Sequence, residues 1–236
     1  MLFSITGKGL SLDDELIEEL YSFGLIPVYI KEINDNSENL NEIVFDLQPG
    51  LEFVDIIDRW DFQPHFIDKI IKFIKQHKKY FCSFVSEESI ASYNALRDFN
   101  DDEGLIFRIF LKGGTTLKIS EHLENGLVLI EGKLELHIIN KSNEKKILYQ
   151  LEGASLGFRL EDLRGNEILS LKGEELEKEK KIEIKAKEKY SDEVDFFLKI
   201  PKDFYKLVVF TSSFKFSEED KGIKFWQFAP INIRIE

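Results

Sequence analysis

The sequence predicts an α+β protein, with a small N-terminal α/β domain over residues 1–111 and an all-β sandwich over residues 112–236. In the first part, apolar runs with the period of a strand alternate with runs that have the period of a helix. In the second part, short β-prone runs follow one another between Gly, Asn, Ser, Lys and Glu, a spacing typical of a sandwich or barrel. A chain of 236 residues is long enough for two such domains.

The first element pair is a strand and a capped helix. "LFSIT" is an apolar strand that ends at the turn "GKG", and Ser11 is placed to cap a helix over residues 11–23. Acidic residues in its first turn suit the positive end of the helix dipole, and Gly24 ends the helix. The apolar residues at helical spacing, which we expect to be its buried stripe, are Leu12, Leu16, Leu20 and Phe23.

Further strands and helices complete the predicted α/β domain. Strands are expected over residues 25–33, 41–47, 80–85 and 104–111. A short helix over 51–60 follows Pro49-Gly50, and Pro64 stands where the first turn of a helix over 65–79 tolerates proline. The segment "SEESIASYNALRDF", residues 86–99, is predicted to be a third, capped helix.

The second part is read as successive strands. They are expected over residues 115–120, 126–132, 133–139, 145–151, 156–160, 167–171, 181–186, 194–200, 206–213, 224–229 and 231–236. Only "GEELEKEKK", residues 173–181, could add a helical turn.

The charge balance limits the classes of partner. The net charge is −12, from 44 acidic and 32 basic residues, which argues against nucleic acid because phosphate binding needs a basic surface. It suits a cytoplasmic protein, a cation binder or a protein with a basic partner. We expect no membrane association, since there is no apolar run of about 18 residues, and no secretory signal is visible.

Cys82 is the single cysteine, so an internal disulfide is excluded. It stands in the apolar run "KKYFCSFVS", where a buried structural thiol is expected rather than a nucleophile.

Gly7-Lys8-Gly9 lies between a strand and a helix, the position of a phosphate-binding loop. The phosphate-binding motif needs two glycines spaced across the phosphate, followed by Lys and then Ser or Thr, and here only Gly7-Lys8-Gly9 is present. The acidic first turn of the following helix would also repel phosphate. We therefore expect no nucleotide site there.

The histidines offer one conceivable metal cluster. His65 is near several aspartates in the sequence, although a solvated acidic face is the favoured alternative. His137 alternates with Leu134, Leu136 and Ile138 in a strand and could simply face outward. The aspartates beside His65 are Asp55, Asp58, Asp61 and Asp68.

Two charged motifs are weaker signals. Glu131-Gly132-Lys133 is similar to half of a nuclease motif, but its aspartate half and basic surroundings are missing, and Gly132 is expected to mark a turn. A lysine stripe on the helix over 65–79 is expected to be solvated, and no Ser/His/Asp set indicates a triad. The stripe consists of Lys69, Lys72, Lys75 and Lys79.

Three segments of the C-terminal half resemble the TerD family of bacterial stress and tellurium-resistance proteins, whose fold is a β-sandwich. They are "LKGGTTLKIS" (111–120), "YQLEGASLGFRLEDLRGNEILS" (149–170) and "EVDFFLKIPKDFYKLVVFTSSFKF" (193–216) with "FWQFAPINIRIE" after it. The resemblance covers about half the chain. It implies that residues 194–200 and 206–210 are paired core strands with Pro201 at the turn, where a missing N–H costs no ladder bond.

The resemblance also bears on calcium, which TerD proteins bind through motif aspartates and a later acidic loop. Gln150 and Glu152 stand in place of the motif aspartates, and the loop is shortened to "EKYSDEVD", which leaves Asp192 and Glu193. Calcium takes six to eight oxygen ligands. With Asp162 as the remaining candidate, we expect either a degenerate member of the family or a β-sandwich of similar topology, without a calcium site.

Three functional hypotheses follow. The first is a non-catalytic cytoplasmic interaction or regulatory protein in a bacterial stress or defence system, with a protein partner. The second is an acidic immunity or inhibitor protein that neutralises a basic target. The third is a metal-dependent hydrolase using Asp55, Asp58, Asp61 and His65. Under the first, we expect no catalytic, cofactor-binding or metal-binding residues.

Overall fold

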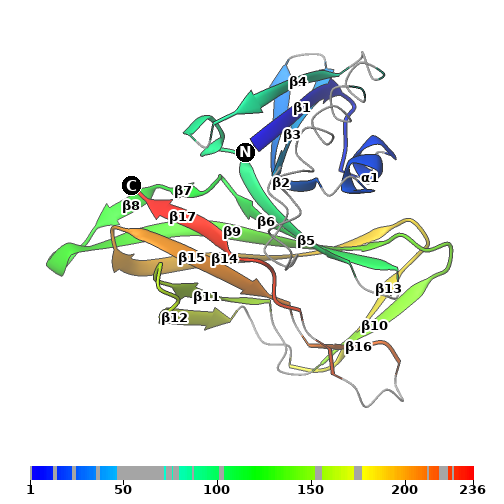
Figure 1. Cartoon of the computed structure of the whole chain (residues 1–236). Coiled ribbons are helices and arrows are strands. Elements are labelled where there is room, and N and C mark those ends of the chain that lie inside the picture. The colour runs from blue at the N-terminus through cyan, green and yellow to red at the C-terminus, as the bar shows by residue number, and fades with distance from the viewer. Residues whose placement is uncertain are drawn as a thin grey trace, which may run out of the picture. The chain divides into compact units, whose positions relative to one another are not determined.

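The computed structural model describes residues 2–12, 15–22, 25–35, 38–46, 72, 76, 80–86, 88–100, 104–151, 156–172, 177–211, 213–217, 223–224 and 226–236. In this part the chain is nearly all-β, with one short α-helix, α1, described over its length and Lys72 and Gln76 also helical. It divides into two compact units, Met1–Tyr93 and Asn94–Glu236 (Figure 1). The predicted α+β class, with an N-terminal α/β domain, is therefore wrong.

The first unit contains an antiparallel sheet. Its strands are β1 (Leu2–Lys8), β2 (Ile26–Asp35), β3 (Glu38–Asp46) and β4 (Phe81–Val85), in the order β2-β3-β1-β4. Each of these three strand pairs is antiparallel. An α/β domain needs parallel strands joined by helical crossovers, so a helix between two of these strands does not make one.

The helix after β1 is confirmed. α1 (Glu15–Ser22) buries its apolar stripe, and the N–H of Leu25 bonds the carbonyl of Leu20 at 3.1 Å just beyond its end. Phe23 and Gly24 lie outside the described residues. The buried side chains of the stripe are Leu12, Leu16, Ile17 and Leu20.

The helix predicted over residues 86–99 is wrong. A single 3₁₀ turn, η1 (Glu88–Ile90), is followed by β5 (Asn94–Asn100), which pairs with β6 (Leu105–Lys112). The neighbours Ala95 and Leu96 are both fully buried, on opposite faces of a strand that is covered on both sides. The helix predicted over 51–60, and nearly all of the one over 65–79, lie outside the described residues.

The second unit consists of strands in three sheets. The first sheet has the order β14-β9-β6-β5, with β8 also on β9; the second is β12-β11-β15-β17-β7; the third is β13-β10-β16. The remaining bounds are β7 (Thr116–Leu117), β8 (Ile119–His122), η2 (Glu124–Gly126), β9 (Leu127–Asn140), β10 (Lys146–Gln150), β11 (Gly157–Glu161), β12 (Glu167–Lys172), β13 (Lys180–Ile184), β14 (Lys189–Pro201), β15 (Phe204–Phe210), β16 (Phe214–Lys215) and β17 (Ile231–Ile235).

The first two sheets pack face to face, so the predicted β-sandwich is confirmed. Phe196 of β14 contacts Phe158 of β11, with ring centroids 4.9 Å apart, and both side chains are buried. A second aromatic group joins β6 to the C-terminal segment, where Phe107 stacks on Trp226 at 4.0 Å.

Two details of the predicted strand pattern are wrong. Residues 126–132 and 133–139 were expected as two strands with a turn at Gly132, but β9 is one continuous strand of 14 residues. Gly132 lies inside this strand. Glycine is required there by packing, since Phe196 of β14 covers its Cα and a Cβ would be 2.1 Å from Phe196 Cζ. Residues 224–229 contribute two isolated bridges rather than a strand.

The expected pairing of residues 194–200 with 206–210 is also wrong. β14 pairs with β9 in one sheet, whereas β15 pairs with β11 and β17 in the other. The connection after Pro201 therefore crosses between sheets instead of closing a hairpin. The aromatic residues of this stretch divide accordingly: Phe196 and Phe214 are buried, whereas Phe197 and Phe204 are exposed.

No helix in the described part of the chain is both long enough and apolar enough to span a membrane.

Candidate functional site

β9 is an inner strand of the first sheet in the second unit, next to the edge strand β14, and its two faces differ in character. It pairs with β14 along one side and with β6 and β8 along the other (Figure 1). Because side chains alternate along a strand, Leu134, Leu136 and Ile138 point into the sandwich core. Glu135 and His137 share the opposite face.

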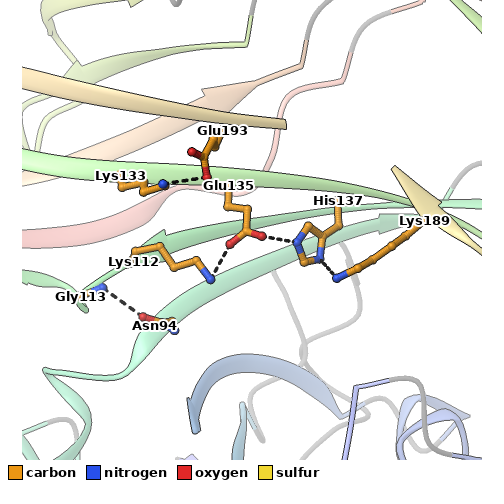
Figure 2. A network of polar contacts seen from close by, with 8 residues as sticks. All are labelled: Asn94, Lys112, Gly113, Lys133, Glu135, His137, Lys189 and Glu193. Atoms are coloured by element: carbon orange, nitrogen blue, oxygen red, sulfur yellow. Dashed lines mark hydrogen bonds and ion pairs between the residues drawn. The ribbon is translucent and has the colours of Figure 1, made fainter. Parts of the chain in front are cut away.

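Four side chains on this opposite face form a chain of polar contacts, which we call the Glu135–His137 network (Figure 2). The Glu135 carboxylate contacts His137 Nε2 at 2.6 Å and Lys112 Nζ at 2.5 Å. Lys189 Nζ lies 3.5 Å from His137 Nδ1. Since a carboxylate only accepts hydrogen bonds, Nε2 carries the ring hydrogen of the neutral imidazole, and Nδ1 accepts from the Lys189 ammonium group.

Burial and charge set the protonation states of the network. Burial lowers the pKa of His137 below its usual 6.5, and Lys189 and Lys112 lower it further, against the opposing effect of Glu135. Burial alone would raise the pKa of Glu135, but the hydrogen bonds and positive charges of Lys112 and His137 bring it down to about 2. At neutral pH the network therefore contains an ionised carboxylate and a neutral imidazole ring.

A buried ion pair lies in the next cross-strand positions. Arg108 of β6 is opposite both His137 of β9 and Asp98 of β5. Its guanidinium donates two hydrogen bonds to the Asp98 carboxylate, at 2.8 and 3.0 Å. The ring edge of Phe110 also packs against His137, with centroids 4.9 Å apart.

The chemistry open to the Glu135–His137 network is limited by its own contacts. A histidine acts as a general base through a free ring nitrogen within reach of the substrate. Here Nε2 donates to Glu135 and Nδ1 faces Lys189. Ser191 is opposite His137 in the strand register. The contact of His137 Nδ1 that Figure 2 shows, however, is with the ammonium group of Lys189. The contacts join β6, β9 and β14.

The same side of β14 carries a more exposed set of side chains. Glu193 bonds Lys133 at 2.7 Å and is 60% exposed. Phe197 is 63% exposed in the middle of the strand. We call this set the β14 face; its members are Lys189, Ser191, Glu193, Asp195, Phe197 and Lys199 of β14 with Glu131 and Lys133 of β9.

The prediction that His137 simply faces outward is wrong, since only 9% of the residue is exposed. Its partners Glu135, Lys112 and Lys189 were not among the predicted site residues. The Glu135-x-His137 spacing in a strand was a usable signal, because residues two apart share a face. Nothing local indicated the two lysines, which come from other strands.

The residues considered as calcium ligands belong to different parts of the structure. The Asp162 carboxylate accepts hydrogen bonds from the main chain of Arg164 and Asn166, which close the turn between β11 and β12. Asp192 and Glu193 lie on β14 in the other sheet, and Glu152 lies outside the described residues. No group of three or more His, Cys, Asp or Glu in the described part of the chain is arranged to hold a metal ion.

The remaining predicted sites divide into two groups. Lys8 ends β1 before a turn at Gly9, and Glu131 and Lys133 lie inside β9 rather than at a turn. Cys82 belongs to β4, but its side chain lies outside the description, and Lys72 of the lysine stripe is exposed. Residues outside the described ranges are Asp55, Asp58, Asp61, His65, Asp68, Lys69, Lys75 and Lys79.

Comparison with known proteins returned distant structural likenesses alone. No family model matches the sequence, and no curated protein matches it. The Northeast Structural Genomics Consortium target SoR45 is 14% identical with a TM-score of 0.37, over 56% of this chain and 88% of that one.

Two further solved structures are comparably remote. The C-terminal domain of wzt is 8% identical with a TM-score of 0.31, over 61% of this chain and 78% of that one. A β-glucosidase from Listeria innocua is 14% identical with a TM-score of 0.25, over 55% of this chain and 16% of that one. TM-scores this low carry no conclusion about fold or activity.

Proposed function

We propose that this chain is a non-catalytic cytoplasmic interaction protein that binds another protein through the β14 face. The TerD resemblance of its C-terminal half suggests a bacterial stress or defence system. The observation that carries the proposal is the exposed aromatic ring of Phe197 in the middle of a strand, with the charged side chains of Asp195 and Lys199 on either side.

This composition suits a protein-binding surface. Interface centres are enriched in aromatic side chains, and their rims are polar. Phe197 would supply the centre, and Glu131, Glu193 and Lys199 would supply the rim. The ring keeps 63% of its surface exposed, so most of it is available for burial against a partner.

The Glu135–His137 network supports the non-catalytic part of the proposal. Both ring nitrogens of His137 already contact protein groups, and the Glu135 carboxylate is held by Lys112 and His137. These contacts hold charged side chains in place instead of presenting a reactive atom.

Affinity capture with quantitative mass spectrometry tests the proposal. The tagged chain is compared with Phe197→Ala and with Phe204→Ala, a matched control because Phe204 is an exposed aromatic residue of the other sheet, 50% exposed. We expect one protein to be captured by the unmodified chain and by Phe204→Ala, and at least about tenfold less by Phe197→Ala, the loss of one hot-spot aromatic. Equal capture by all three baits would contradict the proposal.

A second candidate function is the neutralisation of a basic target, as by an immunity protein or inhibitor. The net charge of −12 favours it, because steering by charge speeds the capture of a basic partner. Repeating the capture at about 50 mM and 500 mM salt separates the candidates, since ionic screening weakens long-range attraction. Loss of a basic partner at high salt favours neutralisation, and capture insensitive to salt argues against it.

A further inference from the structure

The open edge of β14 gives the proposed interaction a specific form. We propose, resting on the function proposed above, that the partner contributes an extended, basic segment that adds to this sheet as a strand beside residues 193–201. Binding of this kind takes its affinity from main-chain hydrogen bonds and its specificity from alternate side chains.

β14 ends the strand order of its sheet. It pairs with β9 at thirteen successive positions, from Lys189 with Ile139 to Pro201 with Leu127. No other strand in the described part of the chain pairs with it. An edge strand of this length presents a row of main-chain donors and acceptors that another strand can use.

Two hydrogen bonds identify which main-chain groups face the open edge. The N–H of Asn140 donates to the carbonyl of Glu188, one position before β14, at 2.9 Å, and the N–H of Glu193 donates to the side chain of Asp192 at 3.0 Å. In an antiparallel pair, residues alternate between those that bond the partner strand and those that point away from it. The N–H and C=O groups of Asp195, Phe197 and Lys199 therefore point in the same direction as those of Glu193.

The two halves of β14 differ in how open they are. In the first half, Lys180 of β13 reaches across to Tyr190, with its Nζ 2.9 Å from the hydroxyl and 5.1 Å from the ring centroid. In the second half, from Glu193 to Pro201, the described contact of this kind is at its very end, where the Tyr205 hydroxyl donates to the Pro201 carbonyl at 2.8 Å. The second half is therefore the part available to an added strand.

Side chains beside this half select a basic segment. Glu193, Asp195 and Glu131 are acidic, against the two lysines Lys133 and Lys199 on the same face. Glu193 and Asp195 both raise the pKa of Lys133. Opposite charges on directly opposed strand residues are stabilising. A segment with lysine or arginine opposite Glu193 and Asp195, and an aromatic or β-branched residue opposite Phe197, complements this edge.

A designed peptide provides the probe. The sequence Thr-Glu-Val-Tyr-Val-Lys-Thr-Lys, capped at both ends and labelled with fluorescein, places lysines opposite Glu193 and Asp195 when it runs antiparallel to β14. The control peptide exchanges every lysine for glutamate and the glutamate for lysine. Fluorescence anisotropy should show binding at least about tenfold tighter for the probe than for the control, as expected for three opposed charge pairs, the third being the peptide glutamate opposite Lys199.

Two variants of one residue isolate the main-chain contribution. Asp195→Ala removes the carboxylate but keeps the N–H, whereas Asp195→Pro also removes the N–H that faces the open edge. The proposal expects Asp195→Pro to bind the probe at least about tenfold more weakly than Asp195→Ala, with circular dichroism confirming that both fold. Hydrogen exchange should show the amides of residues 193–200 protected by the probe in the unmodified chain.

The contrary outcomes are distinct. Equal binding by the two variants, absence of probe binding, or no protection in β14 would overturn strand addition. Concentration-dependent dimerisation abolished by Asp195→Pro would also overturn it, because the occupant would then be a second copy of this chain. If Phe197→Ala still abolishes partner capture while Asp195→Pro and Asp195→Ala capture equally, the proposed function stands without strand addition.

Discussion

Glu135 and His137, two residues apart on β9, are joined by a hydrogen bond of 2.6 Å on the face of the sheet opposite the sandwich core. The bond fixes the tautomer of the ring and leaves Nδ1 to Lys189. Both partners have a pKa below the ordinary value, so both make the stability of the fold depend on pH in the same direction.

The free energy of unfolding should fall as the pH is lowered. The pKa of His137 is lower in the folded chain than the usual 6.5, so below about pH 6.5 the unfolded chain takes up the proton first and is favoured. Glu135 contributes stability above about pH 4.5 that is lost as the pH falls toward 2, on the order of 1–2 kcal/mol after allowance for solvent screening.

Urea unfolding at pH 7, 6 and 5 measures the histidine part. His137→Gln should show a smaller loss of stability between pH 7 and 5 than the unmodified chain. His122→Gln, at an exposed position in β8, is the control and should leave the pH dependence unchanged. An unchanged pH dependence in His137→Gln would contradict the assignment.

Arg108 and Asp98 form an ion pair whose side chains are 3% and 7% exposed. Arg108→Met leaves the carboxylate buried without its guanidinium and should cost about 3–5 kcal/mol, whereas adding Asp98→Leu should recover most of the loss. Chemical denaturation of both single variants and the double variant measures the coupling. Lys145→Met, in an exposed pair with Glu183, should change stability by less than about 0.5 kcal/mol. A double variant no more stable than Arg108→Met would refute this account.

Asn140 is a fully buried amide that links three segments of the second unit. Its Nδ2 carries two hydrogens and lies within hydrogen-bond distance of three carbonyls, those of Glu144, Ile184 and Lys185, at 2.7, 3.0 and 3.1 Å, so one hydrogen is shared between two of them. Asn140→Ala leaves these carbonyls without that donor and should destabilise the chain by about 2–4 kcal/mol. Thermal unfolding beside Asn143→Ala, a change at an exposed turn position, measures the effect; similar melting temperatures would show the contacts to be unimportant.

Gly132 and Phe196 fit together across the β9–β14 pair. A methyl group at Gly132 would lie 2.1 Å from Phe196 Cζ, and that ring is buried against the opposite sheet. Gly132→Ala should therefore cost about 1–3 kcal/mol through overpacking. Combining it with Phe196→Leu should cost less than the sum of the two single changes, because the shorter side chain leaves room. Strict additivity in equilibrium unfolding would exclude the proposed clash.

Calcium should not stabilise the chain. Saturating calcium at one hundred times its Kd would add about 2.7 kcal/mol to the free energy of unfolding. We expect no such gain, since Asp162 is engaged in its own turn and Gln150 is neutral. Thermal melts with and without millimolar calcium decide the matter. A rise of about five degrees or more, abolished by Glu152→Ala, would establish a site.

Strand character was predictable over most of the second unit, because alternating apolar and polar residues state which face of a strand is buried. The same local pattern cannot state which strands pair. In the sequence, β14 and β15 are separated by two residues, a spacing that is also typical of a β-hairpin. In the structure they belong to opposite sheets. Residues 94–99 were predicted to be helical, since a strand buried on both faces loses its alternation.

The candidate site also has features that the local sequence indicates and features that depend on the tertiary structure. The sequence by itself determined that Glu135 and His137 share one face of a strand, because side chains two residues apart point the same way. Only the tertiary structure decided that Lys112 and Lys189 meet them there, that Arg108 takes Asp98 as its partner, and that β14 ends the sheet. These relationships depend on strand order and register, which are set by the packing of residues far apart in the chain.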